Sequence, residues 1–136
     1  MGQQQILFVI LAACIIAVVV SIGVISLTGH EITDNRALLA EDLREIARRA
    51  QAYASLPVGQ GGGGVSFYVL SRLPNALNHL HHPASNAHGD FFIKRSINSS
   101  FMQIIGVGNG AGNDPRRPLR LMITVWADST ALEALN

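Results

Sequence analysis

Cysteine is almost absent from this sequence. The 136 residues contain a single cysteine, Cys14, so no disulfide can form within the chain. This excludes a small secreted domain held together by several disulfides, and it excludes a zinc or iron–sulfur site built from several cysteines. The net charge is also small, at +1. A charge of this size gives no electrostatic reason to expect nucleic acid as a specific ligand.

The first 29 residues contain no Asp, Glu, Lys or Arg. Within them, residues 6–27 form an apolar run whose least apolar side chains are Cys14, Ser21 and Ser26. A helix of that length is about 33 Å long, enough to cross the hydrocarbon core of a bilayer. Because the run is apolar on every face, we expect lipid or other helices to cover it. A basic start, a shorter run and a small-residue cleavage site, which are typical of a cleaved signal peptide, are lacking.

Proline is missing from the first 56 residues and first occurs as Pro57. Residues 31–56 carry apolar side chains at steps of three and four, which is the spacing of one helix face. These are Leu39, Leu43, Ile46, Ala50 and Tyr53. On the other side, Glu45 is placed to pair with Arg48 and Arg49. The sequence therefore predicts one helix of about 50 residues. Residues 1–29 would be its membrane-spanning or filament-core part and residues 30–56 its amphipathic continuation, with Gly29 as a possible break.

Residues 57–64 are rich in glycine, and we interpret them as a flexible linker without packed side chains. After them, the spacing of the apolar residues changes from that of a helix to that of a strand. Alternating patterns then predict strands in Val65–Leu70 and in residues 91–97, 101–107 and 119–126, whereas residues 131–135 suggest one or two helical turns. Sequential strands with short connections form an antiparallel sheet. We therefore expect an α+β fold, in which residues 65–136 form a head with a three- or four-stranded antiparallel sheet. The sheet would pack on the apolar stripe of the long helix.

This layout resembles the type IV pilins and the related pseudopilins. The resemblance covers the whole chain in layout but only residues 1–30 in sequence. In that family the mature chain starts with Phe or Met, carries Glu at its fifth position and continues with about twenty apolar residues. Here Met1, Gln5 and the run from Ile6 occupy the corresponding places. We expect the chain to depart from the family in lacking a basic leader, a proline in the apolar half and a C-terminal disulfide.

The resemblance implies a structural subunit that polymerises through its N-terminal helix into an extracellular, type IV pilus-like filament at the cell surface. The subunit would first be inserted in the cytoplasmic membrane, and its partners would be copies of itself and an assembly machinery. Gln5 would stand in for the family's Glu, which is thought to draw the terminal amine of the adjoining subunit into register. The residues expected to matter for assembly are Gln5, Ile6, Leu7, Cys14, Val18 and Gly23. A monomeric, single-pass, pseudopilin-like component of a secretion machine is the alternative.

Histidines gather in one segment. His79, His81, His82 and His88 are candidate metal ligands, because neutral imidazoles bind zinc, nickel or copper. No cysteine can assist, and the nearest carboxylate in the sequence is Asp90. Prolines around the group indicate a loop, where solvated histidines are ordinary. We therefore expect no metal or cofactor, and a histidine-dependent metal-binding membrane protein is a third alternative.

One further motif is present, at a predicted turn. Asn98 begins an N-x-S sequence at a predicted turn and is a candidate for glycosylation. No Ser/His/Asp or Cys/His group has a context that supports catalysis. We therefore do not expect an enzyme.

Overall fold

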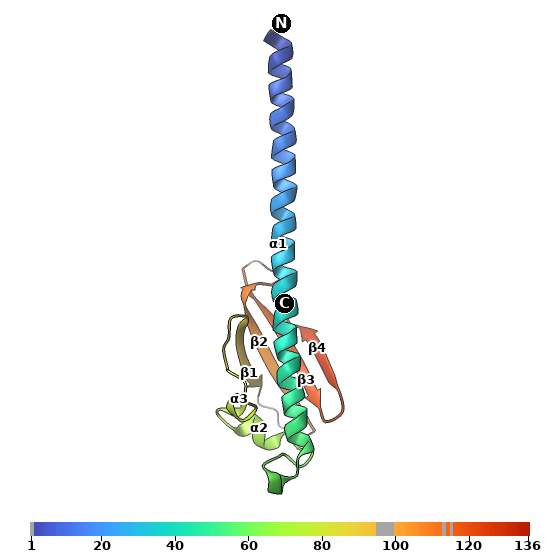
Figure 1. Ribbon diagram of the computed structural model, residues 1–136, viewed down its shortest axis with the longest axis vertical. Coiled ribbons are helices and arrows are strands. Elements are labelled where there is room, and N and C mark those ends of the chain that lie inside the picture. The colour runs from blue at the N-terminus through green and yellow to red at the C-terminus, as the bar shows by residue number, and fades with distance from the viewer. Residues whose placement is uncertain (1, 95–99, 113, 115) are drawn as a thin grey trace. The chain divides into compact units, whose positions relative to one another are not determined.

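The computed structural model describes residues 2–94, 100–112, 114 and 116–136 (Figure 1). The chain divides into two compact units, Met1–Thr33 and Asp34–Asn136. Helix α1, Gly2–Ser55, contributes residues to both units, and its helical assignment continues through Gly29. The candidate glycosylation residue Asn98 lies outside the described residues.

The second unit contains a four-stranded antiparallel sheet in the order β1-β2-β3-β4 (Figure 1). The strands are β1 (Gly89–Lys94), β2 (Phe101–Ala111), β3 (Pro118–Trp126) and β4 (Thr130–Ala134). Alternate residues of β3 are buried, beginning with Leu119 and ending with Val125. The expected α+β class is therefore confirmed, with four strands in the sheet.

The second half of α1 covers one face of this sheet (Figure 1). Leu39, Leu43, Ile46 and Ala50 are all 0% exposed and belong to the same core as the inward side chains of the strands. Tyr53 packs against this core at its edge. Gln51 Nε2 also donates hydrogen bonds to the carbonyls of Trp126 and Ser129, at 3.0 and 3.2 Å. The predicted helical stripe therefore packs against the sheet as expected.

The predicted strand at Val65–Leu70 was wrong. Its second half belongs to α2, Tyr68–Arg72, which is followed by α3, Ala76–His79. Phe67 and Leu70 are both 0% exposed, whereas Tyr68 and Val69 between them face outward. Burial therefore follows a spacing of three, which a helix satisfies and an alternating strand does not.

The predicted helical tail was also wrong, because Thr130–Ala134 forms the edge strand β4. It pairs antiparallel with β3, with Leu132 opposite Ile123 and Thr130 opposite Val125. Every residue of β4 is exposed, so side-chain burial does not select its conformation. The backbone hydrogen bonds to β3 determine the strand conformation instead. Such pairing leaves no alternating pattern of apolar side chains in the sequence of β4.

The glycine-rich segment is folded onto the end of α1. It contains the short 3₁₀-helix η1, Val58–Gln60, and the N–H groups of Gly63 and Val65 donate to the carbonyls of Tyr53 and Ala54 at 2.9 and 2.7 Å. These bonds satisfy carbonyls that the last helical turn leaves unpaired. A Cβ at Gly63 would lie 2.2 Å from the Ser66 carbonyl oxygen. The segment is therefore held on the end of α1 by backbone hydrogen bonds.

Candidate assembly and membrane surface

The first unit exposes a continuous apolar surface. The fifteen large apolar side chains from Ile6 to Leu27 are each 54–72% exposed, with no face of the helix covered. One 18-residue window of α1 has a mean hydropathy of 3.2, and the helix is long and apolar enough to cross a membrane. The N-terminal helix is thus compatible with membrane insertion.

The polar atoms on this surface are few, and one of them has a clear partner. The Ser21 hydroxyl donates to the carbonyl of Ala17, four residues earlier, at 2.8 Å. A serine that bonds back to its own helix carries no unsatisfied donor into an apolar environment. This local bond allows a hydroxyl to be tolerated inside the run.

The residues predicted to matter for assembly all lie on this part of α1 and all are exposed. Leu7, Cys14 and Val18 are separated by seven and four residues, which places them on one face of the helix. Gly23, five residues beyond Val18, lies on the opposite face, and nothing lies within 4 Å of where its Cβ would be. Gln5 and Ile6 lie in the first turns. Three of the six predicted assembly residues, Leu7, Cys14 and Val18, therefore share one face of the helix, and the residues on both faces are exposed.

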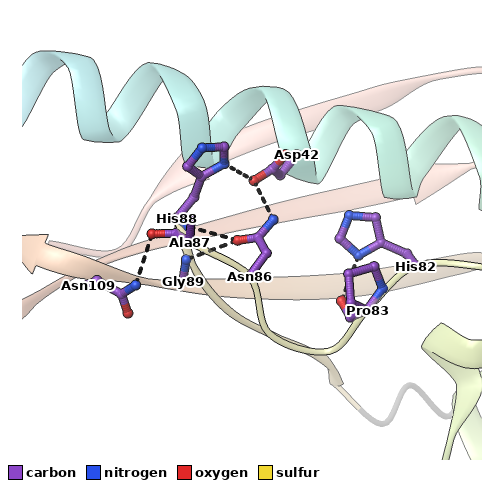
Figure 2. A network of polar contacts seen from close by, with 8 residues as sticks. All are labelled: Asp42, His82, Pro83, Asn86, Ala87, His88, Gly89 and Asn109. Carbon is purple, nitrogen blue, oxygen red and sulfur yellow. Dashed lines mark hydrogen bonds and ion pairs between the residues drawn. The ribbon is translucent and has the colours of Figure 1, made fainter.

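A polar network in the second unit links α1 to the start of β1 (Figure 2). The Asp42 carboxylate accepts a hydrogen bond from Asn86 Nδ2 at 3.0 Å and lies 2.5 Å from His88 Nδ1. The Asn86 side-chain oxygen accepts from the N–H groups of His88 and Gly89, at 2.9 and 3.2 Å. Asn109 of β2 donates to the carbonyl of Ala87 at 3.1 Å. The network fixes a loop that has little apolar burial of its own.

The four candidate histidine ligands are used in three different ways. His88 belongs to the network with Asp42, whereas His82 is buried and meets the Phe91 ring edge-on at 5.3 Å. His82 Nδ1 lies 2.7 Å from the Pro83 carbonyl, which can only accept, so this nitrogen carries the hydrogen. His79 and His81 line an open pocket elsewhere. Among the described residues, no three His, Cys, Asp or Glu side chains are grouped to hold a metal ion.

That pocket lies beside the end of α1 and has a volume of about 480 Å³. Arg49 closes one side of it by donating from Nη1 to the carbonyls of Leu80, at 3.2 Å, and of His81. The Nε of Arg49 donates to Glu45 at 2.9 Å, so the predicted pairing of these residues on α1 is confirmed. The other lining side chains come from the end of α1, from the residue that follows Ser55 and from the α3 turn: Ala52, Tyr53, Leu56, His79 and Leu80.

The sequence did not indicate two long-range side-chain contacts in the second unit. Asp90 is the nearest carboxylate in sequence to the histidines, but Asp42, 46 residues from His88, is the one that pairs. The contacts of Arg49 with the α3 turn are also long-range, at 31 and 32 residues. Neither contact has a local sequence signal, because both depend on how the loop returns to the helix.

Comparisons of the chain with protein-family models, with curated proteins and with solved structures give no match. Fold and site together define an α+β protein with a membrane-compatible N-terminal helix and a separately cored head.

Proposed function

We propose that this chain is the structural subunit of an extracellular, pilus-like filament, in which residues 6–27 of neighbouring copies pack side by side. One observation carries the proposal. The apolar run is exposed on all faces, while the core of the head begins at Leu39 and uses no residue of the run. The large apolar side chains of the run are therefore not covered within the chain, and we infer that their cover comes from outside it.

The energetic drive for such burial is large. Burying a large apolar side chain stabilises by about 1.5–3 kcal/mol, and fifteen of them are exposed here. Lipid covers this surface when the helix is in a membrane, and other copies of the same helix cover it when the chain leaves the membrane. A contact between different faces of successive copies does not close on itself, so it propagates into an open helical polymer.

A monomeric, single-pass membrane protein is the second candidate, and the same helix supports it. The length of the run matches one crossing of a bilayer, and the hydroxyl of Ser21 is satisfied within the helix. In this case lipid remains the permanent partner of the apolar run. The two candidates therefore differ in what covers the run in the mature state.

Electron microscopy of material sheared from cells that produce the chain separates the two. The filament proposal predicts rods whose main component by mass spectrometry is this chain. Membrane fractionation of the same cells provides the counterpart measurement. A chain that stays entirely in the membrane fraction, with no rods in the sheared material, would overturn the filament proposal in favour of the monomeric anchor.

A further inference from the structure

One long segment of the chain contains no acidic residue. Between Glu45 and Asp90 there is no Asp or Glu, but there are three arginines and four histidines. This segment includes the last turns of α1, then η1, α2 and α3, which lie together at one end of the second unit (Figure 1). Glu45, at its boundary, already pairs with Arg48 and Arg49. The three arginines against the single Glu45 leave this segment with a net positive charge.

The same end carries the most exposed apolar side chains of the second unit. Val58, Val65 and Val69 are 73%, 69% and 51% exposed, and no other large apolar side chain among the described residues of this unit is more than half exposed. Leu56 and Tyr68 beside them are also exposed. We call these five residues the apolar tip: Leu56, Val58, Val65, Tyr68 and Val69.

The backbone holds the tip in a defined conformation. Val65 has a φ of 70°, a left-handed conformation that is unfavourable for a β-branched residue, and its N–H is bonded to the Ala54 carbonyl. The preceding Gly64 lies against Val58, since a Cβ there would meet Val58 Cγ2 at 3.0 Å. The valine at position 65 thus projects outward from a strained position in which its side chain contributes nothing to the core.

Basic side chains lie beside two of these apolar residues. The Arg72 guanidinium lies 4.6 Å from the centre of the Tyr68 ring. His79 and His81 line the pocket of about 480 Å³ that also includes Leu56. Aliphatic side chains, a tyrosine and arginines on one surface are the combination that binds an interface between water and acyl chains.

We propose that the apolar tip docks on the surface of an anionic lipid bilayer. The valines would enter the headgroup boundary, while Arg72 and the neighbouring basic groups would meet lipid phosphates. The charges argue for lipid rather than for tip-to-tip contact with a second copy, because no Asp or Glu lies between Glu45 and Asp90 and Glu45 already pairs with Arg48 and Arg49, so two such tips would repel each other. Nucleic acid fits less well, since exposed valines offer no stacking surface for bases. The proposal is independent of whether the chain forms filaments.

The test uses the full chain with its N-terminal helix held in phosphatidylcholine nanodiscs, so that this helix does not bind added lipid. Nanodiscs are mixed with vesicles of phosphatidylcholine alone or with phosphatidylglycerol, and co-flotation is measured. Protein-loaded nanodiscs should float with the anionic vesicles, and added salt should weaken this binding. Empty nanodiscs should not float.

Two variants connect the binding to the tip. Val58→Glu combined with Val69→Glu should weaken binding at least about tenfold, since it removes apolar contact and adds repulsion from the lipid. Leu135→Glu is the matched control, because Leu135 is 41% exposed and hydrogen-bonded to Arg120, away from the tip, and it should bind like the wild type. Val65→Gly should weaken binding while the protein melts no lower, because glycine relieves the backbone strain.

Equal flotation of the wild type and of the double variant would overturn the proposal. So would binding that is the same with neutral and anionic vesicles. Association of loaded nanodiscs with each other in the absence of vesicles, lost in the double variant, would show that a second copy occupies the tip and would also overturn it.

Discussion

The two units of this chain differ in where their apolar side chains find partners. In the first unit, Val18 is 58% exposed on a helix that is apolar all round. In the second, Leu43 is 0% exposed on the same helix α1, where the buried apolar side chains lie on the face that meets the sheet. Substitutions at equally apolar positions should therefore have different consequences. In the first unit they should abolish assembly and leave the fold intact, whereas in the second unit they should lower the stability of the fold.

The largest expected effect is in the first unit. Val18→Asp would place an unpaired carboxylate in the apolar surface, where burial of a charge is prohibitively unfavourable. We expect no rods in sheared material from cells producing this variant, while the head melts at the wild-type temperature in detergent. Val18→Leu keeps the surface apolar and should assemble normally. Rods of normal yield from Val18→Asp would contradict a buried run.

The next largest effect is in the core of the second unit. Leu43→Ala should lower the free energy of unfolding by about 2–5 kcal/mol, because it leaves a cavity between α1 and the sheet. Denaturant unfolding of the full chain in detergent, followed by the fluorescence of the single tryptophan, measures this. Leu38→Ala is the matched control on the same helix, since Leu38 is 40% exposed, and it should change stability by less than about 0.5 kcal/mol. Similar losses for both variants would contradict the packing of α1 on the sheet.

The glycine-rich turn provides a comparison within one segment. Gly63→Ala should destabilise by about 1–3 kcal/mol, because the added Cβ would meet the Ser66 carbonyl and the Tyr53 ring. Gly59→Ala adds the same methyl group where nothing lies within 4 Å, so it should be neutral or slightly stabilising. Thermal melting of the two variants checks the difference. If both behave alike, the turn is not folded onto α1 as described.

The smallest expected effect is the coupling between two residues of the polar network. Asp42→Ala and His88→Ala should each destabilise by about 1–3 kcal/mol, and the double variant should show a coupling of about 1 kcal/mol. The coupling arises because the two side chains meet at 2.5 Å. Glu41→Ala, at the neighbouring exposed position, is the control and should show no coupling with His88→Ala. Strict additivity of Asp42→Ala and His88→Ala would contradict the contact.

The sequence predicted the helices and strands whose buried side chains recur at a regular spacing. The stripe from Leu39 to Tyr53 and the alternation from Leu119 to Val125 are set by which side chains meet the core, so the sequence pattern records them. The segment Val65–Leu70 misled because valine and aromatic residues favour strands, yet Phe67 and Leu70 anchor it at helical spacing. β4 could not be predicted, because none of its side chains is buried.

The candidate sites also differ in whether the sequence alone could predict them. The apolar surface of the first unit follows from composition alone, since a charge-free run has no polar face to distinguish. The pairing of Asp42 with His88 does not, because the two residues are 46 positions apart and their meeting depends on the loop before β1. The basic, acid-free segment was visible in the sequence, but the gathering of its exposed valines required the folded turn.

Cys14 gives the most direct test of the central claim that neighbouring copies cover the apolar run. It is the single cysteine of the chain and is exposed in the isolated structure, so a water-soluble maleimide reports on this position alone. In lipid-free rods sheared from cells, we predict that Cys14 stays unlabelled until detergent dissolves the rods and then reacts fully. Equal labelling of intact and dissolved rods would contradict the account, because the run would then face water.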